Sequence, residues 1–142
     1  MVQVVPYLNF AHSKEVLSFY EKLGAKVTGM VLANDAMFAD MPEDERPKNP
    51  NEFVMNASIE VLGNQIFLSD TWGNKEVDHG GSNLSFVFDQ HDENEVAQVK
   101  SFFKNAIDLG CEETMPLSPS EWSELFGMFK DPYGISWMFS GE

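Results

Sequence analysis

Histidine and cysteine, the residues most often used as catalytic bases, nucleophiles and nitrogen or sulfur metal ligands, are few here, and they lie far apart in the sequence. The three histidines are His12, just before a predicted helix, His79, beside a Gly-Gly pair, and His91, in an acidic loop. The only cysteine, Cys111, follows Gly110 at the end of a second predicted helix, where the negative end of the helix dipole disfavours a thiolate. The sequence contains no Gly-x-Ser-x-Gly nucleophile elbow. These residues do not indicate nucleophilic catalysis, and we interpret Cys111 as a small core residue.

A divalent-metal site is the alternative that these residue types leave open. Glu60 and Asp70 fall in predicted strands, and with His79 they would supply ligands if the loops folded inward. A lone histidine in a loop is more often a surface residue, so we do not favour this set. The single cysteine excludes an intrachain disulfide and a two-cysteine zinc motif, and it is typical of a reducing compartment.

The composition indicates a globular protein and limits its partners. Of the 142 residues, 43% are hydrophobic and 13% aromatic, which is enough for a substantial core without metal or disulfides. Nine basic and 23 acidic residues give a net charge of −14, which repels nucleic acids and anionic membrane surfaces. The sequence has no basic leader with an apolar core and no apolar run long enough to span a bilayer. We therefore expect a soluble cytoplasmic protein with no nucleic-acid or membrane partner.

A weak internal repeat divides the chain into two halves. Ser18-Phe19-Tyr20 with Leu23-Gly24 recurs as Ser101-Phe102-Phe103 with Leu109-Gly110. In both copies an extended apolar stretch precedes a helical segment that ends at a glycine, as helix C-termini commonly do. We expect a single domain, residues 1–142, built from two modules at roughly 1–75 and 80–142.

Each predicted helix carries one apolar stripe that we assign to the core. Ser13 and Asp92 are the candidate N-caps. Apolar residues then recur three and four positions apart, which is the spacing of one helix face. The stripe residues are Val16, Phe19, Tyr20 and Leu23 in the first helix, and Val96, Val99, Phe103, Ala106 and Ile107 in the second.

Short runs of strand-forming residues fill the remainder of each half. Gly63-Asn64 is a hairpin signal, Asp131–Gly134 predicts a turn, and residues 41–51, with their prolines and charges, read as an exposed loop. The predicted strands are Val2–Phe10, Lys26–Leu32, Ala36–Asp40, Phe53–Leu62 and Gln65–Asp70, then Leu84–Phe88, Glu112–Pro116, Leu125–Lys130 and Ile135–Ser140.

This order of elements predicts an α+β fold: two βαβββ modules that form a curved mixed sheet with a concave cavity and the helices outside. Because neighbouring strand residues point to opposite faces, small and polar residues share one face and large apolar residues the other. A face of such mixed polarity suits a pocket wall and a solvated sheet face about equally, so both interpretations stay open. The mixed face carries Asn83, Ser85 and Val87 opposite Leu84, Phe86 and Phe88, and Ser136, Met138 and Ser140 opposite Ile135, Trp137 and Phe139.

Several of these segments, in this order, resemble the vicinal oxygen chelate superfamily of glyoxalases, bleomycin-resistance proteins and ring-cleaving dioxygenases. The segments that look like its PhnB-like subgroup are Pro6–Phe10, Phe19-Tyr20 with Leu23-Gly24, Gln65–Asp70 and Phe126–Trp137. The resemblance covers nearly the whole chain and implies a glyoxalase-like fold. This subgroup is often labelled as similar to a demethylubiquinone methyltransferase. The sequence lacks the glycine-rich strand-to-helix turn that a nucleotide-like methyl donor favours, so we give that label little weight.

The resemblance also implies where a metal would bind. Metal enzymes of the superfamily use four His, Gln or Glu ligands on the first and last strands of each module. The matching positions fall near residues 5–6, near residues 67–68, at Asn83 and at Met138. Only Asn83 offers an oxygen ligand, and Met138 offers a soft thioether that divalent zinc, nickel, iron or manganese does not prefer. We therefore expect no metal and no cofactor.

We predict a metal-free binding protein of the glyoxalase/bleomycin-resistance fold that holds a small aromatic or amphipathic molecule. The resemblance implies a homodimer. Trp122 matches a tryptophan of PhnB-like sequences, and it would either stack on a flat ligand or pack against another part of the protein. One alternative is a metal-dependent lyase, isomerase or dioxygenase with shifted ligand positions, and another is a protein-interaction module. The candidate ligand-binding residues are Phe67, Asn83, Ser85, Trp122, Ser136 and Met138.

Overall fold

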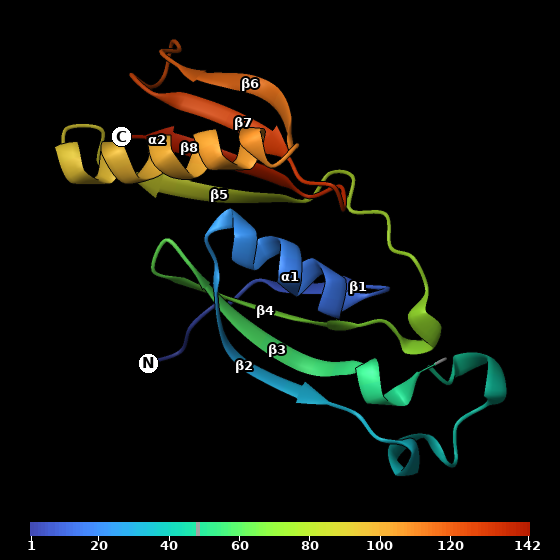
Figure 1. Ribbon diagram of the computed structural model, residues 1–142. Coiled ribbons are helices and arrows are strands. Elements are labelled where there is room, and N and C mark those ends of the chain that lie inside the picture. Colours follow the sequence, from blue (N-terminus) through green and yellow to red (C-terminus); the bar gives the residue numbers. More distant parts are fainter. Residues whose placement is uncertain (48) are drawn as a thin grey trace. The chain divides into compact units, whose positions relative to one another are not determined.

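Each half of the chain folds into a strand, a helix and three further strands. The computed structural model describes residues 1–47 and 49–142, which form two compact units, Met1–Val77 and Asp78–Glu142. Figure 1 shows one long helix beside the strands of each unit. The α+β fold of two βαβββ modules is therefore confirmed. The single domain over 1–142, and the joining of both sheets into one concave surface, stay predictions.

The first unit is a mixed four-stranded sheet in the order β1-β4-β3-β2. Strand β1 runs parallel to β4, whereas β4, β3 and β2 are successively antiparallel. The elements are β1 (Tyr7–Phe10), α1 (Ser13–Leu23), β2 (Lys26–Leu32), β3 (Val54–Val61) and β4 (Asn64–Asp70). Short 3₁₀ helices cover Asp35–Phe38, Glu43–Glu45, Pro50–Glu52 and Trp72–Asn74.

The second unit repeats this topology in the order β5-β8-β7-β6. Strand β5 runs parallel to β8, and the other two pairings are antiparallel. The elements are β5 (Asn83–Phe88), α2 (Glu93–Asp108), β6 (Glu112–Ser118), β7 (Phe126–Lys130) and β8 (Ser136–Gly141). The first and last strands of each module are therefore neighbours. The candidate ligand positions predicted on these strands accordingly lie on adjacent strands.

The two helices begin in different ways. Asp92 caps α2, because its Oδ1 accepts hydrogen bonds from the backbone N–H groups of Asn94 and Glu95 at 2.9 and 3.2 Å. The predicted cap of α1 was wrong: Ser13 is already helical, and His12 occupies the cap position without a side-chain hydrogen bond. The acceptor instead comes from the end of β4, where Asp70 Oδ1 accepts the Ser13 N–H at 2.5 Å.

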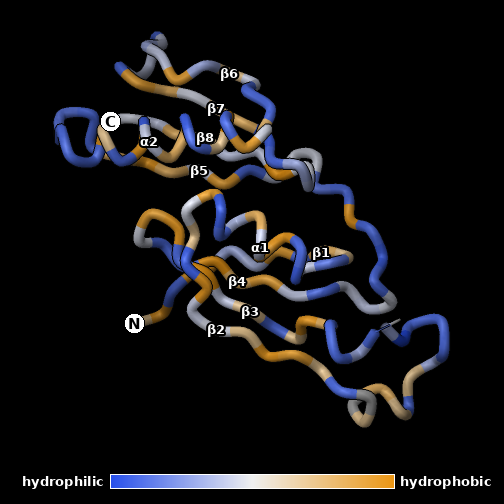
Figure 2. The backbone as a smooth tube through the Cα atoms, in the orientation of Figure 1, coloured by the Kyte–Doolittle hydropathy of each residue, from blue (hydrophilic) through white to orange (hydrophobic). Residues whose placement is uncertain are grey.

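Both predicted helix stripes face the core. In α1, Val16, Tyr20 and Leu23 are buried, and in α2, Val99, Phe103 and Ala106 are buried. The remaining stripe residues, Phe19, Val96 and Ile107, are half-buried, whereas Leu17 and Phe102 are buried without having been predicted. Figure 2 shows hydrophobic residues recurring along the strands and helices of each unit.

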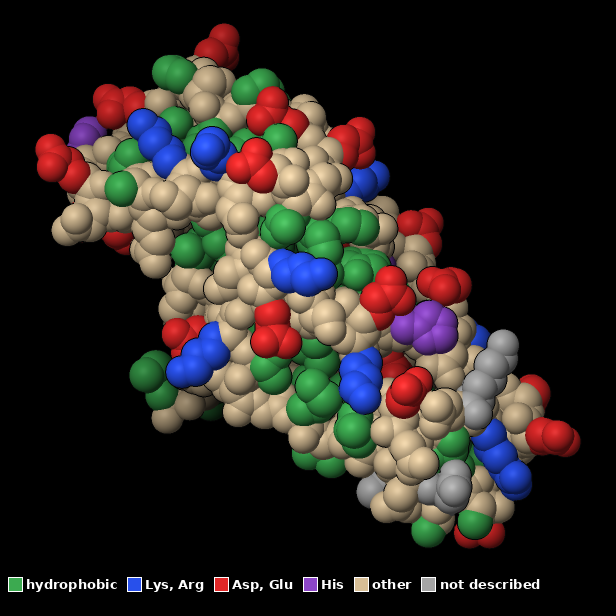
Figure 3. Space-filling view, in the orientation of Figure 1, with side chains coloured by type: hydrophobic (Ala, Val, Ile, Leu, Met, Phe, Trp, Pro, Cys, Tyr) green, Lys and Arg blue, Asp and Glu red, His purple; other side chains and the backbone are tan. Residues whose placement is uncertain are grey.

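Charged side chains are interspersed over the surface. Figure 3 shows Lys and Arg among Asp and Glu on the face drawn, with hydrophobic side chains between them. Acidic residues outnumber basic ones by 23 to nine in the whole chain, so the molecule carries a strong negative field. Neither α1 nor α2 combines the length and the apolar composition needed to cross a bilayer; this holds for residues 1–47 and 49–142.

Besides the cap of α1, three predicted local structures differ from the observed ones. The segment predicted as strand Ala36–Asp40 is 3₁₀ over Asp35–Phe38, because Phe38 buries its ring against Phe53 at 5.3 Å instead of pairing with a strand. The hairpin turn lies one residue earlier than expected: Leu62 and Gly63 both have positive φ, as a type I′ turn requires. The first strand begins at Tyr7, not Val2.

Candidate functional site

In the first sheet, one face of β1 and β4 packs toward α1 and the other is open. The ring of Phe10 lies 6.2 Å from that of Tyr20 on α1, which identifies the helix-facing side. Alternation places Tyr7 and Asn9 on the opposite side. Their partners in register on β4 are Phe67 and Ser69. The open face therefore presents two neighbouring pairs, Tyr7–Phe67 and Asn9–Ser69.

A pocket of about 540 Å³ lies on this open face, entirely within the first unit. Its volume falls within the range of typical small-molecule sites. Tyr7, Asn9 and Ser69 come from the sheet, and the segments around it complete the wall. Met55 comes from β3, Trp72 from the 3₁₀ helix after β4, and Phe53 from the residue between the Pro50–Glu52 3₁₀ helix and β3.

Trp72 forms an aromatic wall that its neighbours hold in place. Its ring stacks on Phe53 at 5.5 Å with an interplanar angle of 18°, and it contacts Phe38 edge-on at 5.9 Å. Phe38 and Phe53 are themselves buried, so the inner face of Trp72 rests on a small core. Trp72 nonetheless stays 51% exposed, and Tyr7 50% exposed. Both rings are therefore available to a flat ligand.

The polar groups of the pocket can orient a ligand but do not form a catalytic pair. The hydroxyl of Ser69 donates to Asn9 Oδ1 at 3.1 Å. The carboxylate of Asp70 already serves the fold, since Oδ1 accepts from Ser13 N–H and Oδ2 from Val54 N–H at 2.9 Å. No nucleophile with an adjacent base lines the pocket in the part of the chain that the structure describes.

The second sheet has an equivalent open face, and it carries four of the predicted ligand-binding residues. Phe102 of α2 contacts Trp137 and Phe139 at 5.8 Å, so these two residues of β8 face the helix. On the other face Asn83 is the register partner of Ser136, and Ser85 that of Met138. The same row continues from Met138 to Met128 and Met115 across β7 and β6.

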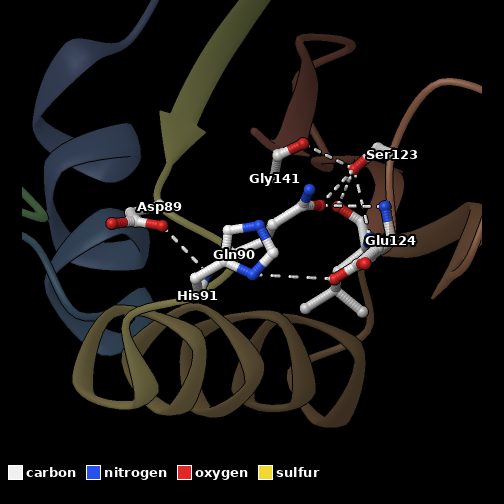
Figure 4. A network of polar contacts seen from close by, with 7 residues as sticks. Asp89, Gln90, His91, Ser123, Glu124 and Gly141 are labelled. Carbon is white, nitrogen blue, oxygen red and sulfur yellow. Dashed lines mark hydrogen bonds and ion pairs between the residues drawn. The ribbon is translucent and has the colours of Figure 1, made fainter.

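Trp122, the fifth predicted residue, lies in the loop between β6 and β7. Its ring is 64% exposed and contacts Phe126 edge-on at 5.4 Å. Gln90 anchors this loop, as Figure 4 shows: its Oε1 accepts the Glu124 N–H at 2.9 Å, and Ser123 Oγ donates to the Gly141 carbonyl at 2.7 Å. The sixth predicted residue, Phe67, is half-buried beside Tyr7 in the first unit.

The residue types on the open faces do not fit the metal ligand set that the superfamily implies. Across β1, β4, β5 and β8 these faces carry amides, hydroxyls, aromatic rings, an aliphatic residue and one thioether; they have no His, Asp or Glu and a single Gln, Gln65, near the start of β4. Apart from Gln65, these side chains are poor ligands for divalent zinc, iron or nickel. Within residues 1–47 and 49–142, no three His, Cys, Asp or Glu side chains gather as a metal site.

Cys111 is buried beside the turn at Asp131. Burial, and to a smaller extent the charge of Asp131, raise the pKa of the thiol from 9.0 to about 11. The Asp131 carboxylate is held by Trp137 Nε1–H at 3.0 Å and by the N–H groups of Tyr133 and Ile135. The thiol is therefore protonated at neutral pH, which agrees with the core role predicted for it.

Sequence reasoning placed five of the six candidate residues on strands and Trp122 in a loop, but it missed the pocket of the first unit. The structure brings Asn83, Ser85, Ser136 and Met138 together on one face, with Phe67 and Trp122 elsewhere. Trp72 was not predicted as a site residue, because it lies after β4 in a short 3₁₀ helix whose sequence has no periodic pattern. For the sheet residues of the pocket, the sequence did carry a signal: Tyr7 alternates with Leu8 and Ser69 with Leu68, which places Tyr7 and Ser69 on the face away from the core.

Comparison with known proteins identifies the family. A search of curated proteins found no match. Protein PA1353 from Pseudomonas aeruginosa has a similar structure, with 28% identity, a TM-score of 0.68 and coverage of 100% of this chain and 98% of that one. A PhnB protein from Bacillus cereus has 18% identity and a TM-score of 0.64, and the match covers 99% of this chain and 100% of that one. A bleomycin-binding protein whose structure was solved with bleomycin has 14% identity and a TM-score of 0.59, and the match covers 100% of this chain and 99% of that one.

The family model covers nearly the whole chain. It spans residues 5–139, so it includes the first strand of the first module and most of the last strand of the second. This range contains the pocket at Trp72 and, apart from Ser140, both open faces. The chain belongs to the glyoxalase/bleomycin resistance protein/dioxygenase superfamily.

Proposed function

We propose that this protein binds a small aromatic organic molecule without a metal ion, and that the pocket beside Trp72 is the binding site. The observation that carries the proposal is the composition of that pocket. Two half-exposed aromatic rings, Trp72 and Tyr7, flank the hydrogen-bonded pair Asn9–Ser69 in a volume of about 540 Å³. Apolar walls with a few placed polar groups are typical of small-molecule sites.

The donor chemistry of the open faces supports binding over metal-dependent catalysis. A lyase, isomerase or dioxygenase of this superfamily would rely on a divalent metal to polarise its substrate. Amide and hydroxyl groups such as those of Asn9, Ser69 and Asn83 bind such metals weakly compared with imidazole and carboxylate. Elemental analysis of purified protein tests this point, and we expect far less than one equivalent of zinc, nickel, iron or manganese. One tightly held equivalent would favour the enzyme.

The residues predicted from sequence remain part of the proposal as a second contact surface. Asn83, Ser85, Ser136 and Met138 form one open face, and Trp122 stands on the anchored loop at β7. The methionine row beside them supports this role, because thioether side chains adapt to ligands of different shape. Phe67 supports the Tyr7 ring edge-on at 6.3 Å in the first unit.

The proposal is tested with a neutral aromatic probe. N-phenyl-1-naphthylamine should bind saturably and brighten on transfer to the apolar pocket, and Trp72→Ala should weaken its binding by about tenfold because a ring wall is lost. Met30→Ala is the control, since Met30 is an exposed apolar residue of β2 outside the pocket. Unchanged binding in a folded Trp72→Ala variant would place the site elsewhere.

Mass spectrometry of small molecules that co-purify with the protein then identifies the ligand class directly. An aromatic compound retained by the parent protein and lost from Trp72→Ala would support the proposal. The absence of both a retained compound and probe binding would favour the protein-interaction module instead.

Self-association and cellular location stay predictions. The superfamily resemblance implies a homodimer, and the single cysteine favours a reducing compartment such as the cytoplasm. Sedimentation equilibrium measures the first, and a monomer at micromolar concentration would contradict it.

A further inference from the structure

The lining of the pocket beside Trp72 offers no positively charged side chain, within the residues that the structure describes. No Lys, Arg or His lines it in the described part of the chain, and Asp70, which does, has its carboxylate bound by the N–H groups of Ser13 and Val54. The nearest basic residue along the sequence, Lys75, is exposed and is followed by Glu76. An anionic ligand would therefore leave water without gaining a charged partner, which is costly.

The charge of the whole chain acts in the same direction. With a net charge of −14, the surface potential concentrates cations near the protein and repels anions, most strongly at low ionic strength. This long-range field does not select a shape. It biases which charge type reaches the pocket.

The aromatic rings add a short-range preference for the same charge. The face of an indole or phenol ring is electron-rich, and it attracts a cation placed over it, most strongly for tryptophan. The inner face of Trp72 is occupied by Phe53, so the outer face remains for a ligand. Tyr7 offers a second half-exposed ring in the same pocket.

Resting on the proposed function, we propose that this pocket selects planar aromatic cations over neutral and anionic molecules of the same shape. Heteroaromatic ammonium compounds are the ligand class that matches its walls. The flat ring system stacks on Trp72, and its positive charge meets the aromatic faces and the acidic surroundings. The amide of Asn9, with both donor and acceptor atoms, orients polar substituents.

A shape-matched probe series tests the charge preference. N-methylacridinium is a cation, acridine is neutral at about pH 8, and acridine-9-carboxylate is an anion. We expect calorimetry to show that affinity falls from the cation to the neutral probe to the anion. The cation should bind about tenfold more tightly than the neutral probe, a difference within the range of cation–π energies. Raising the salt concentration from about 0.02 to 0.5 M should reduce this ratio of affinities without bringing it to one, because screening removes only the long-range electrostatic attraction.

Variants separate the ring contribution from simple apolar contact. Trp72→Leu keeps an apolar side chain but no aromatic face, so the ratio between cation and neutral probe should fall severalfold, whereas Trp72→Phe should keep most of it. If Trp72→Leu does not fold, Tyr7→Leu provides the same comparison from the other ring. Met30→Ala should leave all three affinities unchanged.

The outcomes distinguish the two proposals. Equal binding of the cation and the neutral probe, or tighter binding of the anion, would overturn the charge selection while leaving small-molecule binding at Trp72 intact. If no probe binds, or if all bind independently of Trp72 and Tyr7, then the proposed binding site itself fails.

Discussion

A single carboxylate, that of Asp70, joins three elements of the first unit. It ends β4, accepts the first N–H of α1 from Ser13, and accepts the N–H of Val54 at the start of β3. Asp70 is 8% exposed, so these amides would have few water partners if the carboxylate were removed. The side chain therefore sets the relative position of α1 and the strands that carry the pocket.

Replacing Asp70 should accordingly destabilise the fold. We expect Asp70→Ala to lower the free energy of unfolding by about 2–4 kcal/mol, because two buried donors lose their acceptor. Asp70→Asn should cost less, since its carbonyl oxygen still accepts one of them. Urea denaturation measures both. Asp40→Ala, at an exposed carboxylate, is the control and should change stability by less than about 0.5 kcal/mol. Equal effects of Asp70→Ala and Asp40→Ala would refute the assigned role.

Cys111 should behave as an inert core thiol in the folded protein. Its pKa is raised from 9.0 to about 11 by burial and by Asp131, so the unfolded chain loses this proton at lower pH than the folded chain. The contribution of Cys111 to the free energy of unfolding is therefore fully present below pH 9 and is lost as the pH rises from 9.0 to about 11. Cys111→Ala should flatten that decline in urea titrations.

Thiol reactivity gives an independent check on Cys111. A disulfide reagent should react with the native protein slowly at about pH 8, because little thiolate is present, and rapidly once the protein is unfolded. Fast stoichiometric labelling of the native state would show that the thiol is accessible and ionised, contrary to its buried position.

The loop that carries Trp122 depends on one side chain from another segment. Gln90 Oε1 accepts the Glu124 N–H, whereas the nearby ion pair joins His91 Nδ1 to Glu124 Oε2 at 4.0 Å between side chains that are both 71% exposed. A 2.9 Å hydrogen bond to a backbone N–H contributes more than a 4.0 Å ion pair between two exposed side chains, which water screens. Gln90 is therefore the anchor, and His91 is incidental.

Removing the anchor should loosen the loop without unfolding the sheet. We expect Gln90→Ala to speed hydrogen exchange at the Glu124 amide by about fivefold or more, consistent with loss of roughly 1 kcal/mol. His91→Ala is the matched control at the neighbouring position, and it should leave that rate unchanged. Equal acceleration in both variants would show that the ion pair holds the loop as firmly as the Gln90 amide does, contrary to the role assigned to Gln90.

Elements with a strong periodic pattern were predictable, whereas elements fixed by distant partners were not. The stripes of α1 and α2 follow from residues three and four apart, and the Asp92 cap lies next to the helix that it serves. The segment at Phe38 had no such local signal, since its 3₁₀ form depends on burial against Phe53. The pocket wall at Trp72 depends on that same ring, so sequence alone could not find it.

At the scale of the molecule, two similar modules have diverged at matching places. The pair Tyr7–Phe67 in the first sheet corresponds by register to Ser85–Met138 in the second, and Asn9–Ser69 corresponds to Val87–Ser140. One module thus presents aromatic rings where the other presents a hydroxyl and a thioether. The fold repeats because the core pattern repeats, while the open faces are free to differ.

The acidic composition should make stability depend on salt. Fourteen excess negative charges on 142 residues repel one another more in the compact folded state than in the expanded unfolded chain. Because added salt screens this repulsion, we expect the melting temperature to rise by several degrees between about 0.02 and 0.5 M sodium chloride at neutral pH. Near the isoelectric point the net charge vanishes, so the rise should largely disappear there. A melting temperature that falls with salt at neutral pH would mean that attractive ion pairs outweigh the net repulsion.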